Sequence, residues 1–159
     1  MKHYVLTIFS FAVLFTGCQK TKVQIQLKYL GAAGWVITNE GTKVLIDPYL
    51  SRIKLVGMST SSKISNASKN RDWGSDTRNK YYRDDRYEPD TTIINYMING
   101  DIIDSSSYIF VHHTHFDHAA DVPYIAMKTG ARVIGTESLS NLLRAHGVPN
   151  KQIVTVKGG

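Results

Sequence analysis

The densest group of chemically active side chains in the sequence is the run His112–His118, which holds four of the six histidines and one aspartate. Neutral imidazole and carboxylate groups are good ligands for zinc and similar divalent metals. A tight turn would direct His113 and His115 to one point, and Asp117 and His118 to another. Two metals a few ångströms apart would then share a hydroxide, because their charge produces such a nucleophile from water at neutral pH.

The alternative is that these histidines have no metal role. Isolated histidines are usually surface residues or hydrogen-bonded core residues, and His112 fits that description as the end of the preceding apolar segment. Four ligand-type side chains crowded on one turn are a poor structural choice without a cation. We therefore predict metal binding for His113, His115, Asp117 and His118, and not for His112.

The spacing of this run also carries a family resemblance. His113–His118 resembles the HxHxDH signature of the metallo-β-lactamase fold superfamily of metal-dependent hydrolases, and it lies between a short apolar strand and a helix, as in that family. Tyr29–Trp35 and Val44–Pro48 look like the family's opening strands. Within the superfamily, the chain is most similar to the predicted zinc-dependent hydrolases that include ascorbate-phosphate lactonase-like enzymes. The resemblance covers residues 23–50 and 108–159.

The resemblance implies a role for each matching residue. His113 and His115 would bind the first metal, Asp117 and His118 the second, and Asp117 would also orient the bridging hydroxide as the catalytic residue. The implied cofactor is zinc, with two ions in a full-length parent and manganese or iron as alternatives. Asp47 would support the metal-binding loop from behind the ligands; a simple turn at the end of a strand is an equally good interpretation.

The rest of the family's ligand set is not matched. The family fold is an αββα sandwich of two similar halves, and the second half brings another histidine, a bridging aspartate and a final histidine. After His118 the chain offers Asp121, which fits a helix cap, and His146, which fits the end of a helix where it complements the dipole. Gly158-Gly159 resembles an interior turn. We therefore expect the first half of such a sandwich plus an insertion.

The elements that must position the run follow from hydrophobic periodicity. Apolar residues alternate or cluster in three short stretches, which predict the strands of an antiparallel meander at 23–29, 35–37 and 43–46. Asp47-Pro48 ends the third strand. The second part alternates strands with helices, which indicates βαβ units and an α/β or α+β fold. Its expected elements are a strand at 108–111, a helix from Asp121 to Thr129, a strand at 132–134, a helix capped by Thr136 or Ser138, and a strand at 153–156.

Residues 51–104 are the expected insertion. The stretch 58–68 has almost no periodicity, and 71–88 is rich in tyrosine and in charges of both signs. Pro89-Asp90 then opens a short helix that Gly100 ends. Long structureless loops are uncommon and often functional, so the insertion lies over or beside a site, or it is a solvated surface excursion.

Composition limits the class of protein. A length of 159 residues with 42% hydrophobic residues and one cysteine fits a single domain and excludes a disulfide framework. The charged start, short apolar core and Phe15–Cys18, which resembles a bacterial lipobox, predict a lipoprotein signal peptide at 1–17, lipidation of Cys18, a linker at 18–22 and a domain at 23–159. The protein would then be exported and held at a bacterial envelope membrane.

The function predicted from these observations is a metal-dependent hydrolase that attacks an ester, lactone, amide or phosphodiester of a small-molecule substrate. The alternative is a non-catalytic envelope lipoprotein that binds only a metal or a partner. A third class, nucleic-acid processing, is suggested by the net charge of +6. Lys and Arg are scattered, however, and a lipid anchor argues against this class, so we expect no nucleic-acid partner.

Overall fold

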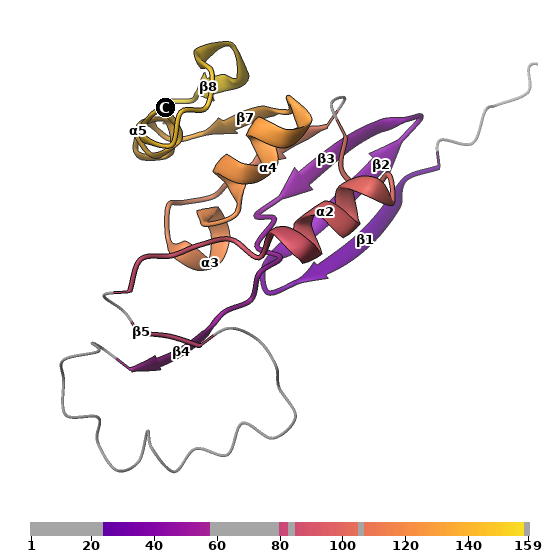
Figure 1. Cartoon of the computed structure of the whole chain (residues 1–159). Coiled ribbons are helices and arrows are strands. Elements are labelled where there is room, and N and C mark those ends of the chain that lie inside the picture. The colour runs from indigo at the N-terminus through magenta and orange to yellow at the C-terminus, as the bar shows by residue number, and fades with distance from the viewer. Residues whose placement is uncertain (1–23, 58–79, 83–84, 105–106, 158–159) are drawn as a thin grey trace, which may run out of the picture.

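A computed structural model describes residues 24–57, 80–82, 85–104 and 107–157 (Figure 1). These residues form a six-stranded sheet of order β1-β2-β3-β6-β7-β8 and a separate two-stranded sheet, β4-β5. The strands are β1 (Gln26–Gly31), β2 (Gly34–Asn39), β3 (Thr42–Ile46), β4 (Lys54–Gly57), β5 (Lys80–Tyr82), β6 (Tyr108–Phe110), β7 (Arg132–Gly135) and β8 (Ile153–Thr155). The helices are α2 (Thr91–Asn99), α3 (Phe116–Ala119), α4 (Val122–Thr129) and α5 (Glu137–Ala145), with a 3-10 turn η1 (Asn150–Gln152).

The first three strands confirm the predicted antiparallel meander. β1 pairs with β2, and β2 pairs with β3 in a register that places Trp35 opposite Ile46. Glu40 and Gly41 join β2 to β3 with positive φ values of 47° and 82°. Two consecutive residues in this conformation make the hairpin turn whose twist matches that of the flanking strands, and glycine adopts it without steric cost. The turn therefore fixes which face each residue of β2 and β3 occupies.

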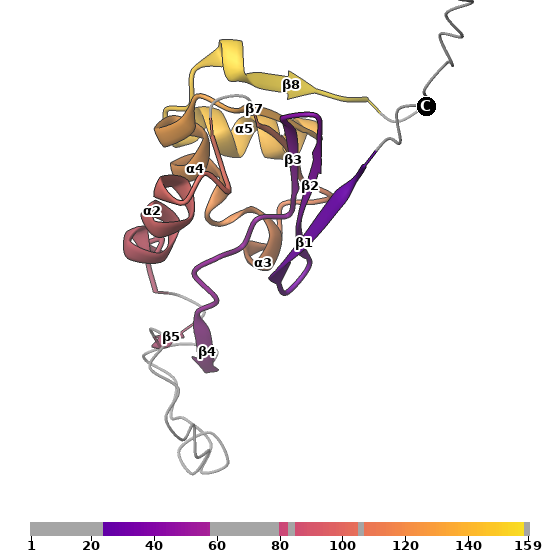
Figure 2. The ribbon, with the colours of Figure 1, turned by 90° about the vertical axis from the view of Figure 1, so that its right-hand side faces the viewer.

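The later strands confirm the predicted βαβ units. β3, β6, β7 and β8 run parallel, and parallel neighbours require crossover connections, which here contain α2, α4 and α5. Figure 2 shows α2, α3 and α4 on the same side of β1, β2 and β3. The described chain is thus a mixed α/β sheet with helices on one face. The four-layer sandwich remains a prediction.

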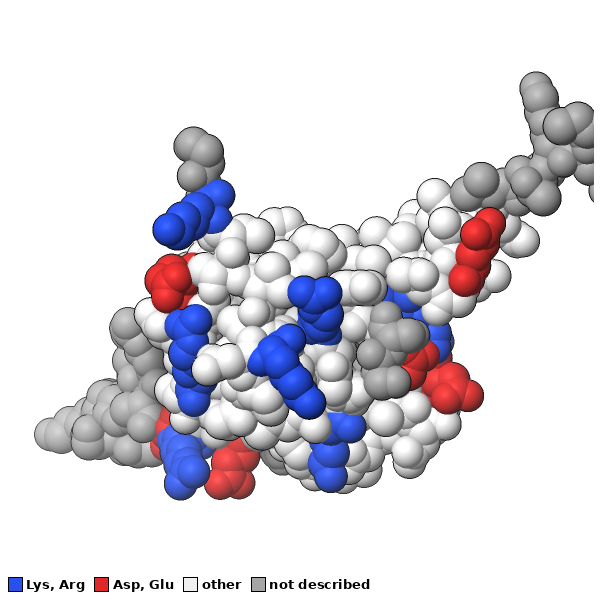
Figure 3. Space-filling view, turned by 90° about the horizontal axis from the view of Figure 1, so that it is seen from above, with Lys and Arg blue, Asp and Glu red and all other residues white. Residues whose placement is uncertain are grey.

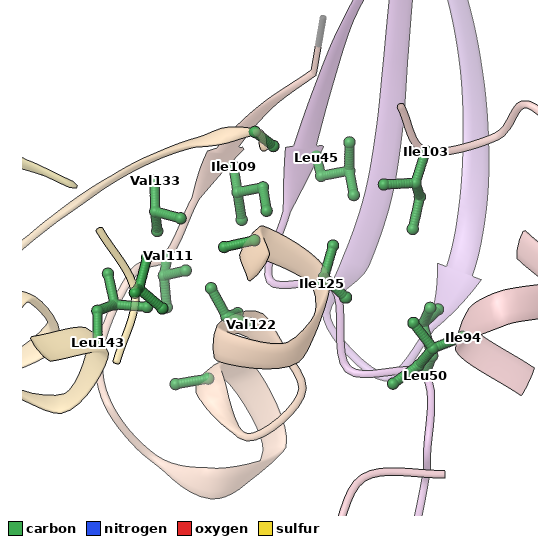
Figure 4. Packing of buried hydrophobic residues seen from close by; sticks show 14 of the residues in the cluster. Leu45, Leu50, Ile94, Ile103, Ile109, Val111, Val122, Ile125, Val133 and Leu143 are labelled. Carbon is green, nitrogen blue, oxygen red and sulfur yellow. The ribbon is translucent and has the colours of Figure 1, made fainter. Parts of the chain in front are cut away.

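The hydrophobic core lies between the sheet and these helices (Figure 4). Leu45, Ile109 and Val133 occupy neighbouring register positions on β3, β6 and β7, and all three are fully buried. Val122 and Ile125 of α4 pack against them in the same cluster. The cluster includes Ile109 and Val111, which directly precede His112–His118 in the chain. The packed core therefore holds in place the strand end from which the predicted metal-binding loop starts.

The predicted insertion contains two kinds of structure. The helix expected after Pro89-Asp90 is confirmed as α2, where the Asp90 side chain accepts hydrogen bonds from the backbone N–H groups of Thr92 and Ile93, and Gly100 follows the last turn. The parallel pair β4-β5 was not expected from the sequence. Residues 58–79 lie outside the described part of the chain.

The predicted signal peptide at 1–17, the lipidation site Cys18 and the linker at 18–22 all lie within residues 1–23, which are outside the described residues. Within the described ranges, none of the helices is both long enough and apolar enough to cross a membrane.

Candidate metal centre

The candidate centre forms where β3 and β6 end side by side. Asp47 follows β3, and its backbone N–H donates to the carbonyl oxygen of Phe110 at the end of β6, with an N to O distance of 3.0 Å. His112 comes two residues after Phe110. The carboxyl ends of parallel strands form one edge of a sheet, where α/β proteins place their ligands. The pairing of β3 with β6 therefore brings Asp47 to the start of the histidine run.

Asp47 is the anchor of this group. Its side chain is 1% exposed, and its Oδ1 accepts the backbone N–H of His112 at 2.9 Å. Its Oδ2 lies 2.6 Å from Nδ1 of His112 and 2.8 Å from Nδ1 of His118. Burial by itself raises the pKa of the Asp47 carboxyl, but the backbone N–H of His112 and the adjacent imidazoles of His118 and His112 outweigh it and hold the pKa below its usual value. Asp47 is therefore an ionised carboxylate at neutral pH.

The other predicted ligands lie around His118. The ring of His113 is 4.1 Å from that of His118 and 4.5 Å from that of His115, measured between centroids. Nε2 of His113 is 3.0 Å from Nδ1 of His115. Asp117 is next to His118, with its Oδ2 3.8 Å from Nε2. The structure thus brings together the four residues that the sequence indicated, while their division between two metals stays a prediction.

A compact ligand triad lies within this group. Asp47, His112 and His118 each offer one ligand atom, and these atoms lie within 4.8 Å of one another. Nδ1 of His118 is buried and, among the described residues, has no partner aligned for a hydrogen bond, although Oδ2 of Asp47 is close. A buried imidazole nitrogen beside an anionic oxygen is a donor set that suits a divalent cation. The residues present therefore fit a metal ion.

The geometry adds His112 and Asp47 to the candidate metal ligands that the sequence indicated. His112 was excluded from the metal set as the end of a strand, yet its ring belongs to the candidate triad. Asp47 was expected to support the loop from behind, and it also lies close enough to be a ligand. The missing signal was the pairing of β3 with β6, which brings together residues 65 positions apart.

Asp121 has a different role from the one predicted. It occupies the position before α4, but its side chain makes no capping hydrogen bond with that helix. The carboxylate is fully buried. Its Oδ2 accepts the backbone N–H groups of Leu50 at 2.6 Å and Ser51 at 2.8 Å, and its Oδ1 accepts the hydroxyls of Ser51, at 2.7 Å, and Tyr87. Asp121 therefore joins the loop after Asp47 to the segment that carries His118.

Tyr87 and its neighbours show where the predicted insertion meets this centre. Burial and the adjacent Asp121 carboxylate raise the pKa of the Tyr87 phenol far above its usual value, so the phenol stays a hydrogen-bond donor. The hydroxyl oxygen of Ser51 accepts the backbone N–H of Asp90 at 2.7 Å. A cleft of about 330 Å³ is lined by Tyr87 together with Thr114 and Phe116 of the histidine run. The end of the insertion thus lies beside the site.

Comparison with known proteins gives partial matches. No family model matches the chain. Proteins named UPF0173 metal-dependent hydrolase from Staphylococcus aureus strains JH9 and N315 are each 44% identical over 52 residues, which is 32% of this chain. These matches support a metallo-β-lactamase-like superfamily. The match spans 23% of the length of these curated relatives.

A solved structure is also similar to this chain. It is Igni18, a metallo hydrolase from the archaeon Ignicoccus hospitalis, with 18% sequence identity and a TM-score of 0.44. The similarity covers 85% of this chain and 40% of the archaeal chain.

Proposed function

We propose that this chain provides the metal-binding loop of a zinc-dependent hydrolase that acts on a small-molecule ester, lactone, amide or phosphodiester. The observation that carries the proposal is the buried Asp47 carboxylate held between His112 and His118, beside His113, His115 and Asp117. When bound, a divalent cation supplies Lewis-acid activation of water at neutral pH. The curated relatives, named as metal-dependent hydrolases, support the same class.

Two aspartates of the chain have different roles in this proposal: Asp47 orients the histidine ligands, and Asp117 acts on the attacking water. Asp47 is buried and orients the rings of His112 and His118 through their Nδ1 atoms, which leaves Nε2 of His118 facing Asp117. Such carboxylate–histidine pairs fix the ring orientation of metal ligands. Asp117 is about half exposed, so its carboxylate is accessible to substrate and can orient a water molecule or accept its proton.

The proposal extends to the complete architecture. We take the described sheet as one half of an αββα sandwich whose other ligands come from a second half. Lipid attachment at Cys18 and an envelope location belong to the same proposal. Figure 3 shows Lys and Arg spread across one face rather than gathered in a patch, which supports a small-molecule substrate over nucleic acid.

A non-catalytic metal-binding protein is the second candidate. It is favoured by the positions of the two later residues of ligand type. The Asp121 carboxylate accepts four hydrogen bonds within the protein, and His146 lies at the end of α5. In this case the histidine cluster holds a metal without turnover.

Metal analysis of the purified chain tests the binding step. We expect zinc to be retained by the wild type and reduced in His118→Ala, His115→Ala and Asp117→Ala. His146→Ala is the matched control, because it removes an imidazole that lies outside the cluster. Equal zinc in all five proteins would refute the proposal. Hydrolysis of a panel of esters, lactones and phosphodiesters by the zinc-loaded chain then separates the hydrolase from the non-catalytic alternative.

A further inference from the structure

The cleft beside the histidine run lies on the opposite side of α3 from the candidate metal triad. One wall of this cleft consists of Phe116, Ala119, Ala120 and Pro123. Their spacing places them on one face of a helix, and the helical backbone angles at Ala120 and Asp121 continue that face from α3 into α4. His118 lies two residues after Phe116, about 200° around the helix axis, and its ring contacts Asp47. The cleft is therefore separate from the metal triad, none of whose members lines it.

The remaining walls show that the cleft belongs to the helix layer. α5 contributes Leu142 and His146, which are one helical turn apart. The segment that runs past α3 to α2 contributes Arg86 and Tyr87 (Figure 1). Residues of α3, α4 and α5 also share the core cluster on the helix side of the sheet. The second half of the proposed sandwich would cover the other side of the sheet, so it would not close this cleft.

The interior of the cleft suits an apolar group of limited size. Phe116 is 46% exposed, and its ring makes an edge contact with the ring of Tyr49, with centroids 6.0 Å apart. Ala119 and Pro123 are buried, and Leu142 is half-buried. The volume of about 330 Å³ lies at the lower end of small-molecule sites, which span roughly 300–1,000 Å³. Since a water molecule occupies about 30 Å³, a ligand of about ten to twelve non-hydrogen atoms fits.

The charges around the cleft favour an anion. Arg86 and His146 are both exposed and line the cleft. Among the described residues, the lining includes no aspartate or glutamate, and no carboxylate forms an ion pair with Arg86. The carbonyl oxygens of residues 142–144 accept hydrogen bonds from the N–H groups of residues 146–148, which reduces the negative charge at this end of α5. A guanidinium binds a carboxylate through two parallel N–H donors, so a carboxylate is the anion that fits best.

We propose that this cleft binds a small organic carboxylate whose apolar chain or ring lies between α3 and α5. Phe116 and Leu142 shield the apolar part of the ligand from water, and Arg86 pairs with its carboxylate. The imidazole of His146 and the hydroxyl of Thr114, which also lines the cleft, are further hydrogen-bond donors. The binding site does not rest on the proposed hydrolase function, because its residues are not members of the metal triad.

Titration calorimetry of the full chain with 4-phenylbutyrate tests the proposal. This probe joins a phenyl ring to one carboxylate and matches the volume of the cleft. The chain is first freed of metal with a chelator and dialysed, so that the carboxylate has no metal ion to bind. We expect saturable binding with a Kd on the order of 1 mM or below.

Three variants and an uncharged probe locate the binding. Arg86→Gln should weaken binding of 4-phenylbutyrate about fivefold, which is what an exposed ion pair contributes at most. Arg144→Gln is the matched control, because Arg144 is a partly exposed arginine of α5 that does not line the cleft, and it should bind like the wild type. Ala120→Leu should abolish binding, because the larger side chain fills the cleft. The uncharged 4-phenylbutyramide should bind the wild type and Arg86→Gln equally.

Far-UV circular dichroism establishes that each variant is folded, and Arg86→Gln with its control decides the question if Ala120→Leu does not fold. Absence of saturable binding to the metal-free wild type would overturn the proposal. Equal affinity of the folded wild type and Arg86→Gln for 4-phenylbutyrate would do the same. Binding that occurs only after zinc is added would place the carboxylate at the metal centre, and would also overturn it.

Discussion

Replacement of Asp121 by asparagine should destabilise the protein strongly, although the two side chains have nearly the same shape. The Asp121 carboxylate is fully buried and accepts hydrogen bonds from Leu50, Ser51 and Tyr87. An asparagine side chain has one acceptor oxygen, and its NH₂ group would face donors that Asp121 now satisfies.

The size of the effect follows from the number of broken contacts. At least two donors lose their acceptor, and each hydrogen bond to a charged group contributes about 1.5–3 kcal/mol. We therefore expect Asp121→Asn to lower the free energy of unfolding by about 3–6 kcal/mol. For a chain of this size, a loss of 1 kcal/mol lowers Tm by roughly 2–4 °C, so the expected drop in Tm is on the order of 10 °C.

Urea unfolding followed by circular dichroism measures this loss. Asp101→Asn is the matched control, because Asp101 is exposed on the turn after α2 and should change stability by less than about 0.5 kcal/mol. Tyr87→Phe should cost about 1.5–3 kcal/mol. The double variant Asp121→Asn/Tyr87→Phe should cost less than the sum of the two, because the variants share one hydrogen bond. Equal stability of Asp121→Asn and wild type would refute this reasoning.

Three further outcomes are expected. Asp47→Asn should weaken zinc affinity about 10–100-fold by titration calorimetry, because orienting carboxylates contribute that much to metal sites; unchanged affinity would contradict the role of Asp47. The pKa of Asp47 in the folded protein is lowered from the ordinary value of 3.8. Ionised Asp47 therefore stabilises the folded state fully when the pH is above the pKa of the unfolded chain, and this stabilisation is lost as the pH falls through the lower pKa of the folded state. Urea midpoints of metal-free wild type and Asp47→Asn should therefore converge in that acid range, and a gap that widens there would exclude the linkage. Ile109→Ala should cost about 2–5 kcal/mol in the same assay, because Ile109 is fully buried between β6 and the helices; a cost below 1 kcal/mol would mean that this core is not packed as described.

Local patterns were sufficient to predict most elements of the fold. The Asp90 cap of α2, the Thr136 cap of α5 and the left-handed Gly130 after α4 are signals within a few residues of the helix ends, and the structure confirms them. The density of ligand-type side chains in His112–His118 likewise indicated the site, because residues so close in sequence stay close in space when the chain turns at the end of a strand.

Contacts between distant segments could not be predicted in the same way. Asp121 resembles a helix cap from its neighbours in sequence, but its partners Leu50 and Ser51 lie 70 or more positions away. The contact of His112 with Asp47 similarly depends on β3 pairing with β6. No periodicity within either segment encodes such a pairing, which tertiary packing decides.

The hydrogen bond from the backbone of Asp90 to the hydroxyl of Ser51 has a consequence for how this protein can evolve. It closes the chain between residues 51 and 90 at its base, and Asp121 holds the same serine. The entropic cost of a closed loop grows only with the logarithm of its length, by about 0.6 kcal/mol for each doubling. Lengthening the chain between these two residues therefore costs little free energy, and new binding surfaces can arise there while Tyr87 keeps its hydrogen bond to Asp121 and the geometry of Asp47 and His118 is preserved.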